Sequence, residues 1–346
     1  MNNRLMFKIL RITIIIVFSF LIGYFINQKN IDELNAEIKK QENVPEEDLG
    51  YELREKGLYR FINPLLECEV AKGTIESKKQ NFDKELDVFV QKEIDESNLT
   101  KMGIYFRDLN NGPTFGINED ELFIPASLLK LPIMMVYFYI AEKDPGILKK
   151  EIIFEKPTEL KEMGVQFIEP SQEIKIGNKY TAEQLIEAMI EYSDNQAVIL
   201  LTNNLSDSGY TQKTADFFNF FNIDSSNFTN LKGSLSVKEY GRFFRILFNA
   251  SFLNRDYSEK ALKLLSEVEY KNALVAGLPK GIVVSHKFGE SGFSKGERQL
   301  HDCGIIYYPN HPYLLCIMSK GENLSALESS ISKVSQFVYN KIAEQY

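Results

Sequence analysis

The sequence has few of the residues that build disulfide scaffolds and metal centres. Only three cysteines and three histidines occur in 346 residues. The cysteines, Cys68, Cys303 and Cys316, are too few for a disulfide framework, and neither residue type shows metal-ligand spacing. Cys303 and Cys316 flank a predicted hairpin and could face each other across two strands. We expect no bound metal, and we expect the thiols to be free and buried.

The sequence also has no excess of positive charge. Its 40 lysines and arginines are outnumbered by 48 acidic residues, which gives a net charge of −8. Nucleic-acid binding needs a basic surface, so this balance argues against nucleic acid as a partner. No phosphate-binding glycine motif or dinucleotide fingerprint is present either. No cofactor is therefore expected.

One long apolar run lies close to the start of the chain. It reads ITIIIVFSFLIGYFI over residues 12–26, follows Arg4, Lys8 and Arg11, and ends before Lys29. A basic segment followed by an apolar stretch is typical of an export signal, and no small-residue cleavage site follows it. Because positive charge stays on the cytoplasmic side, the rest of the chain is predicted to lie outside the cytoplasm. Secretion after cleavage remains the alternative.

These features divide the chain into three parts. Residues 1–28 are predicted to be a cytoplasmic tail and a signal anchor that spans the membrane. Residues 29–74 begin with a polar stretch and are predicted to be a stalk or linker. Residues 75–346 are predicted to form one domain, with a helical lobe at about 125–275.

Hydrophobic periodicity predicts helices at both ends of that domain and in its middle, with strands between them. In the first helix, at 77–97, five apolar side chains are predicted to share one face: Phe82, Leu86, Val88, Phe89 and Ile94. The other expected elements are a hairpin at 102–120, a helix at 181–195, a helix at 236–253, strands at 281–289, 299–309 and 312–321, and a last helix at 324–342.

The order of these elements predicts an α/β (α+β) domain with two lobes. Strands from both ends of the domain can pair in one antiparallel sheet, and the helical block is inserted between them. Thr181 and Gln184 form a predicted capping box at the start of one helix in that block. A cleft between the two lobes is the natural place for a functional site.

Three short motifs could supply chemistry to that cleft: Ser127-Leu-Leu-Lys130, Ser193-Asp194-Asn195 and Lys287-Phe288-Gly289. Pro125 fits just before a helix start, so Ser127 is expected near a helix N-terminus. Ser127 and Lys130 are three residues apart on one helical face and can touch. A lysine in an apolar segment favours its neutral form, which could take a proton from the serine.

The motifs and their surroundings resemble class A β-lactamases and penicillin-binding serine hydrolases. The order of the three motifs matches the S-x-x-K, S-D-N and K-T-G set of that family. The flanking segments FIPASLLKLP, MIEYSDNQAVILL and AGLPKGIVVSHKFGESG are similar too, and the resemblance covers about residues 75–345. It implies a two-lobed β-lactamase/transpeptidase-like fold, in which an antiparallel five-stranded sheet is flanked by helices and carries an inserted all-helical lobe.

The resemblance also implies roles for the catalytic residues. Ser127 would be the acylated nucleophile, and Lys130 would accept its proton. Ser193 would relay a proton to the leaving nitrogen. Lys287 would direct positive charge toward Ser193 and a substrate carboxylate.

Three further residues are implied to bind substrate. Asn195 would hydrogen-bond the amide of the substrate's side chain, while its neighbour Asp194 would hold the turn. Gly289 and Glu290 would line the cleft. The backbone N–H groups of Glu290 and Ser127 would form the oxyanion hole.

Two departures from the family pattern concern release of product and recognition of substrate. The loop glutamate that activates water is missing: the stretch FNIDSSNFTNLKGSLSVKEYG after the S-D-N segment has no E-x-x-x-N pattern and no glutamate before Glu239, which is expected to belong to the next helix. Asp224 is the nearby carboxylate and is expected at a turn or helix end. Phe288 replaces a hydroxyl residue that normally helps to bind the substrate carboxylate. Its side chain is therefore expected either to enter the core or to change substrate preference.

Three functions remain open at this point. The first is a serine hydrolase acylated by β-lactams or related amides, with slow deacylation. The second is a D-alanyl-D-alanine peptidase or transpeptidase acting on peptidoglycan peptides, and the third is a non-catalytic module that keeps the fold.

His286, which precedes Lys287, is expected to be structural because it should face the opposite side of its strand from Lys287.

Overall fold

The computed structural model describes residues 52–54, 59–68, 76–110, 114–158, 166–221, 223, 234–292 and 296–346. The predicted membrane anchor at 12–26 and the polar part of the stalk lie outside these residues. None of the helices within the described ranges is long and apolar enough to cross a membrane.

The structure contains the predicted helix, hairpin, helical block, three strands and last helix, together with short strands that the sequence did not predict. The strands are β1 (Glu52–Arg54), β2 (Leu65–Cys68), β3 (Leu99–Asp108), β4 (Thr114–Ile117), β5 (Leu122–Phe123), β6 (Glu151–Ile153), β7 (Lys179–Thr181), β8 (Leu235–Ser236), β9 (Val284–Gly292), β10 (Arg298–Ile306) and β11 (Tyr313–Gly321). The helices are α2 (Glu76–Glu96), α3 (Lys130–Ala141), α4 (Gly146–Lys149), α5 (Ala182–Glu191), α6 (Asn195–Asp207), α7 (Thr211–Phe220), α9 (Val237–Phe248), α10 (Arg255–Ser266) and α11 (Leu324–Gln345). Two short 3₁₀ helices are η1 (Ala126–Leu129) and η2 (Val275–Gly277).

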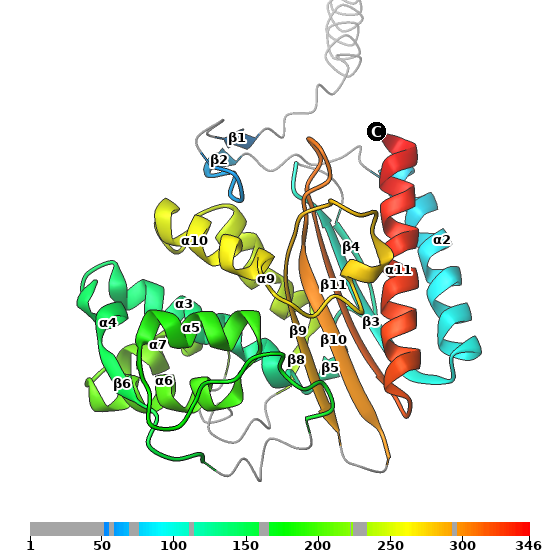
Figure 1. Ribbon diagram of the computed structural model, residues 1–346. Coiled ribbons are helices and arrows are strands. Elements are labelled where there is room, and N and C mark those ends of the chain that lie inside the picture. Colours follow the sequence, from blue (N-terminus) through cyan, green and yellow to red (C-terminus); the bar gives the residue numbers. More distant parts are fainter. Residues whose placement is uncertain are drawn as a thin grey trace, which may run out of the picture. The chain divides into compact units, whose positions relative to one another are not determined.

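One antiparallel sheet of five strands organises the domain. Its order is β4-β3-β11-β10-β9, so the hairpin β3–β4 pairs with three strands from the other end of the domain. Helices α2 and α11 lie side by side on one face (Figure 1). Helices α9 and α10 contact strands β11 and β9, and the remaining helices form the inserted lobe (Figure 1). The predicted two-lobed fold is confirmed.

The inserted lobe is built around α3, which is buried along almost its whole length. Because its sequence is apolar on all sides, α3 can only be stable when other helices surround it. The predicted capping box is present at the start of α5, where Thr181 and Gln184 satisfy each other's backbone N–H groups. The helix predicted at 181–195 ends at Glu191, however, because Ser193 adopts a left-handed φ of 57° and starts a turn.

The buried face of α2 differs from the predicted one at one position. Val88 is 71% exposed, whereas Val90 is buried against the core. Leu86 is fully buried, and a residue two positions along a helix points about 200° away, while one four positions along returns to the same side. The prediction for Val88 was therefore wrong, because the strict helical period favours Val90.

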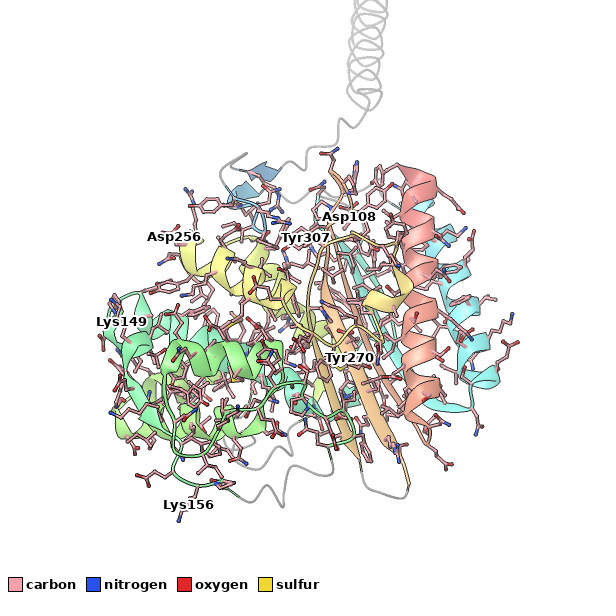
Figure 2. All side chains as sticks on the ribbon, in the orientation of Figure 1. Asp108, Lys149, Lys156, Asp256, Tyr270 and Tyr307 are labelled. Carbon is pink, nitrogen blue, oxygen red and sulfur yellow. A yellow bond between two sulfur atoms is a disulfide. The ribbon has the colours of Figure 1, made fainter. Side chains whose placement is uncertain are left out.

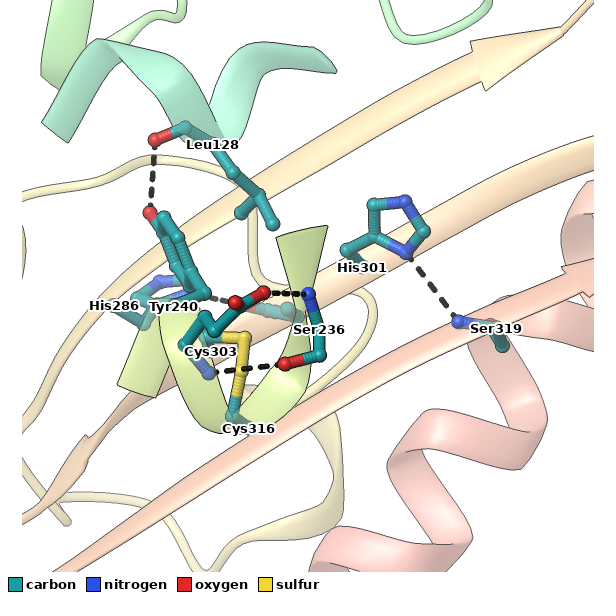
Figure 3. Close-up of a disulfide and its surroundings, with 10 residues drawn as sticks. Leu128, Ser236, Tyr240, His286, His301, Cys303, Cys316 and Ser319 are labelled. Carbon is teal, nitrogen blue, oxygen red and sulfur yellow. Dashed lines mark hydrogen bonds and ion pairs between the residues drawn. A yellow bond between two sulfur atoms is a disulfide. The ribbon is translucent and has the colours of Figure 1, made fainter. Parts of the chain in front are cut away.

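Strands β10 and β11 are joined by a disulfide that the low cysteine content did not predict. Cys303 and Cys316 lie directly opposite each other in the strand register and form a disulfide bond (Figure 3). The expectation of free thiols was wrong for this pair. The two residues flank the hairpin at equal distances, and cross-strand neighbours are close enough for two sulfur atoms to bond.

Residues 59–68, here called the strap, pack against the domain although we assigned them to the stalk. The Glu259 carboxylate accepts hydrogen bonds from the three backbone N–H groups of residues 60–62, at 2.9, 2.9 and 3.0 Å. The Phe61 ring meets Tyr307 edge-on at 5.5 Å, and the Tyr307 hydroxyl donates to Phe61 O (Tyr307 is labelled in Figure 2). The compact unit therefore begins before residue 75.

The corrected face of α2 can be tested by stability measurements. Leu86→Ala should lower the free energy of unfolding by about 2–5 kcal/mol, because it leaves a cavity in the core. Val88→Ala is the matched control and should change it by less than about 0.5 kcal/mol, because the side chain is exposed. Urea denaturation of both variants measures the difference, and equal losses would contradict the assignment.

Candidate active site

Ser127 lies in η1, the 3₁₀ turn that leads directly into α3. Strand β9 passes close to this turn at Gly289. A Cβ atom on Gly289 would lie 2.7 Å from Pro125 O and 2.9 Å from Leu128 N, which are backbone atoms that cannot move aside. Only glycine permits this approach, which places Ser127 beside strand β9. In the same turn, Leu128 O accepts a hydrogen bond from the buried Tyr240 hydroxyl (Figure 3).

The backbone just before Ser127 adopts a costly conformation. Ala126 has a φ of 48°, in the left-handed region that residues with a Cβ seldom adopt. Ser193, in the turn before α6, has a φ of 57°. Such residues cost on the order of 1–3 kcal/mol each and gather at functional sites. The turns that carry Ser127 and Ser193 therefore both have strained backbones.

Lys130 is buried and turns toward the Ser193 motif. Its Nζ donates to Ser193 O at 2.5 Å, to Ser193 Oγ at 2.9 Å and to Asn195 Oδ1 at 2.7 Å. The expected contact between Lys130 and Ser127 is not among the hydrogen bonds of the described residues, although one turn of helix carries both. The amine donates instead to these three acceptors, which lie in the turn before α6 and at the first residue of that helix.

The turn that holds Ser193 is fixed by its neighbour Asp194. One carboxylate oxygen caps α6 by accepting from Ala197 N at 2.8 Å. The other accepts from Ile174 N at 2.9 Å. Asp194 therefore has the turn-holding role that the sequence predicts, and it leaves Ser193 and Asn195 to face the cleft.

Lys287 reaches the same serine from strand β9. Its side chain is fully buried, and its Nζ lies 3.1 Å from Ser193 Oγ and 3.1 Å from Phe288 O. Ser193 Oγ is thus within hydrogen-bond distance of two lysine amines, one from α3 and one from β9. The structure brings Lys130, Ser193, Asn195 and Lys287 together.

Burial controls the charge of both lysines. It lowers the pKa of Lys130 well below 10.5, and the nearby charge of Lys287 lowers it further, against weaker attraction from Asp194 and Glu290. Burial also lowers the pKa of Lys287 to about 7, with Asp302 and Glu290 opposing the effect. Burial consequently favours the neutral amine of Lys130.

Glu290 follows Gly289 on β9 and points its carboxylate at a neighbouring loop. Its Oε1 accepts hydrogen bonds from Phe167 N at 3.0 Å and Ile168 N at 2.7 Å. Burial raises the pKa of this carboxyl, while the two backbone hydrogen bonds act in the opposite direction. The sequence predicted a role only for the backbone of Glu290, and the side-chain contact was missed.

The same loop contacts Asn195. Asn195 Nδ2 donates to Gln166 Oε1 at 2.8 Å. The sequence offered no signal for Gln166, because it lies in a loop without a motif and 29 residues before its partner. Only the fold brings the two side chains together.

Phe288 points into the protein, one of the two outcomes expected for it. It is 4% exposed, and its ring lies 4.2 Å from the ring of Tyr270, centre to centre (Tyr270 is labelled in Figure 2). The Lys287 ammonium lies 4.1 Å from the centre of the Phe288 ring, so the ring face stabilises that cation. Phe288 and Tyr270 also line part of a pocket of about 230 Å³.

Two other residues from the sequence analysis have structural contacts. His286 Nδ1 lies 2.8 Å from Asp302 Oδ1, and Asp302 Oδ2 accepts from Leu274 N at 3.0 Å (His286 is shown in Figure 3). Glu239 forms a capping box with Ser236 at the start of α9. Asp224 lies outside the described residues. Within those residues no group of three possible ligands could hold a metal ion.

The low pKa of Lys287 gives a pH dependence with a definite sign. Between about pH 7 and pH 10.5 the unfolded chain binds this proton and the folded chain does not, so stability rises with pH. Lys287→Met removes that contribution. The unfolding free energy of wild type minus that of the variant should rise between pH 7 and 9, by at most about 1.4 kcal/mol per pH unit.

Denaturant titrations at several pH values measure this difference. Lys280→Met, which changes an exposed lysine close to the start of the same strand, is the control and should give a flat difference. A flat difference for Lys287→Met as well would contradict the low pKa.

Comparison with known proteins places this geometry in a family. The family model described as the beta-lactamase enzyme family matches residues 84–342. Beta-lactamase VEB-1 from Pseudomonas aeruginosa is 24% identical over 263 residues, which cover 69% of this chain and 85% of that protein.

Solved structures show the same fold. PBP-A has 21% sequence identity and a TM-score of 0.61, over 75% of this chain and 96% of PBP-A. A mutant of PBP-A, solved as an acyl-enzyme complex with penicillin-G, has 20% identity and a TM-score of 0.60, over 77% of this chain and 97% of the mutant. Since the family model spans most of the sequence, the chain belongs to the beta-lactamase enzyme family and is a serine hydrolase of the acyl-enzyme type.

Proposed function

We propose that Ser127 is the nucleophile of this hydrolase and that a β-lactam or a related amide acylates it. The observation that carries the proposal is the position of Ser193 Oγ, 2.9 Å from Lys130 Nζ and 3.1 Å from Lys287 Nζ. This arrangement links two buried amines through one hydroxyl, beside the turn that carries Ser127. Apolar side chains of similar size would often stabilise the fold as well as these buried polar groups do, so the cluster points to a function.

The proton path follows from these contacts. Ser127 Oγ attacks the carbonyl carbon and passes its proton to neutral Lys130. As the carbon–nitrogen bond breaks, Ser193 donates its proton to the leaving nitrogen and takes one back from Lys130. Ser127 and Lys130 are not hydrogen-bonded in the unliganded protein, and catalytic hydrogen bonds of this kind often tighten only when substrate binds.

Two sources of positive potential would support acylation. The backbone N–H groups of Ser127 and Glu290 are proposed to bind the developing oxyanion, because Gly289 brings strand β9 against η1. Lys287 is proposed to attract a substrate carboxylate. An anion beside it would favour its charged form, since its pKa of about 7 leaves it poised between the two states.

Release of the acyl group is proposed to be slow. Glu239 is the first glutamate after the S-D-N motif. Its carboxylate caps α9, because Oε2 accepts a hydrogen bond from Ser236 N at 3.0 Å. Phe288 is buried and offers no hydroxyl to a substrate carboxylate. Both observations favour the second candidate, a D-alanyl-D-alanine peptidase or transpeptidase on peptidoglycan peptides, over an efficient β-lactamase.

We further propose that the domain works outside the cytoplasm, on the anchor at residues 12–26. The basic residues before that run support this orientation. The disulfide between Cys303 and Cys316 supports it independently, because such bonds persist mainly in oxidising compartments. Protease treatment of cells without their wall should digest the domain, and full protection would contradict the proposal.

Labelling with a fluorescent penicillin tests the nucleophile. Wild type should acquire one covalent label per chain, and Ser127→Ala should acquire none, because the variant lacks the hydroxyl that is proposed to attack. Ser325→Ala, which changes an exposed serine on α11, is the matched control and should label like wild type. Equal labelling of Ser127→Ala would refute the assignment, and the absence of label in wild type would favour a non-catalytic module.

Cleavage of a chromogenic cephalosporin tests deacylation. We expect a burst of about one product per enzyme followed by little or no turnover, because the family's loop glutamate is missing from the sequence after the S-D-N motif. Sustained turnover at rates of about 10–1,000 per second, typical of efficient enzymes, would show that another group replaces the missing glutamate. A burst alone would favour the peptidase or transpeptidase.

A further inference from the structure

Residues 166–168, here called the latch, lie across the amide-binding side of the candidate site. The Gln166 side chain uses both ends of its amide. Its Oε1 accepts from Asn195 Nδ2 at 2.8 Å, and its Nε2 donates to Ile168 O at 2.9 Å. The loop therefore presents a rigidly oriented amide carbonyl to Asn195.

Two strands of the sheet hold the rest of the latch. From β9, the Glu290 carboxylate accepts from both Phe167 N and Ile168 N. From β10, the Arg298 guanidinium lies 4.1 Å from the centre of the Phe167 ring, a cation–π contact. These contacts fix the backbone of the latch, and the Gln166 side chain joins it to Asn195 at the start of α6.

The orientation of the Asn195 amide follows from the Gln166 side chain. Gln166 Nε2 donates to the carbonyl oxygen of Ile168, which can only accept, so Gln166 Oε1 faces Asn195. Asn195 therefore presents Nδ2 to Gln166, and its Oδ1 accepts from Lys130 Nζ at 2.7 Å. Asn195 Nδ2 is the donor that the amide of a substrate's side chain would use, and it is already engaged by an amide of the protein.

We propose that Gln166 occupies the place of the substrate's side-chain amide on Asn195, so that an acylamino substrate must displace it before acylation. Gln166 is then a specificity-determining residue that disfavours substrates with an acylamino group. This inference rests on the proposed function, since it concerns access to the site that contains Ser127.

Two penicillins that differ only at this group provide the test. Benzylpenicillin carries an acylamino side chain, whereas 6-aminopenicillanic acid carries a free amine with no carbonyl to exchange for Gln166. The measured quantity is the second-order rate constant for acylation of each, determined by competition with a fluorescent penicillin. The ratio of the two constants cancels general effects on folding or on the nucleophile.

Gln166→Ala should raise the ratio of benzylpenicillin to 6-aminopenicillanic acid by about 2- to 12-fold, the value of one net hydrogen bond. Gln166→Glu should lower it, because a charged acceptor binds Asn195 Nδ2 more tightly. Gln172→Ala, which changes an exposed glutamine in the same loop region, is the control and should leave it unchanged. A purely structural role for Gln166 would move both Gln166 variants in the same direction.

The outcomes separate this inference from the proposed function. If wild type is labelled and Gln166→Ala leaves the ratio unchanged, the latch proposal is overturned while Ser127 keeps its role; this is the result expected if substrate uses the second hydrogen of Asn195 Nδ2. If none of the proteins is labelled, the proposed function falls and the latch falls with it. Labelling by benzylpenicillin in Gln166→Ala alone would support both.

Discussion

The burial of two lysines around one hydroxyl group is the constraint on which the rest of the site depends. An isolated buried ammonium is too costly to persist, so it must find partners or lose its proton. Lys130 and Lys287 do both, because they share Ser193 Oγ and repel each other's charge. The left-handed turn at Ser193 and the close approach of strand β9 are the means by which two lobes bring these groups to one point. A loss of packing anywhere between the lobes would admit water and restore both amines to ordinary behaviour.

Local features of the site were predictable because they depend on neighbours in the sequence. The capping box at Thr181, the hairpin before residue 120 and the helix start near Ser127 each follow from a few adjacent residues. The overall sheet was predictable as well, since a five-stranded antiparallel arrangement is what the order of strands and the family resemblance both imply. Which residues could meet in the cleft was thus foreseeable. How they divide their hydrogen bonds was not, and Lys130 in fact donates to Ser193 and Asn195.

The features that escaped prediction depend on contacts between distant segments. Pairing of Cys303 with Cys316 requires one strand register out of several that the hairpin permits. The contact of Gln166 with Asn195 depends on how a loop crosses the cleft, and no local pattern encodes that path. Val88 differs from these, because the helical period alone places Val90, and not Val88, on the side of Leu86. The exposure of Val88 is therefore encoded locally, whereas the two long-range contacts are not.

The strap gives the domain an order of assembly. Residues 59–68 hydrogen-bond to α10 and to the end of α9, which lie almost 200 residues later in the chain. Strand β3 likewise pairs with β11, which is the last of the five sheet strands along the chain. During synthesis these early segments emerge with nothing to pair with, and closing such long loops is slow. The strap and strand β3 can therefore reach their final places only after the rest of the domain has been made.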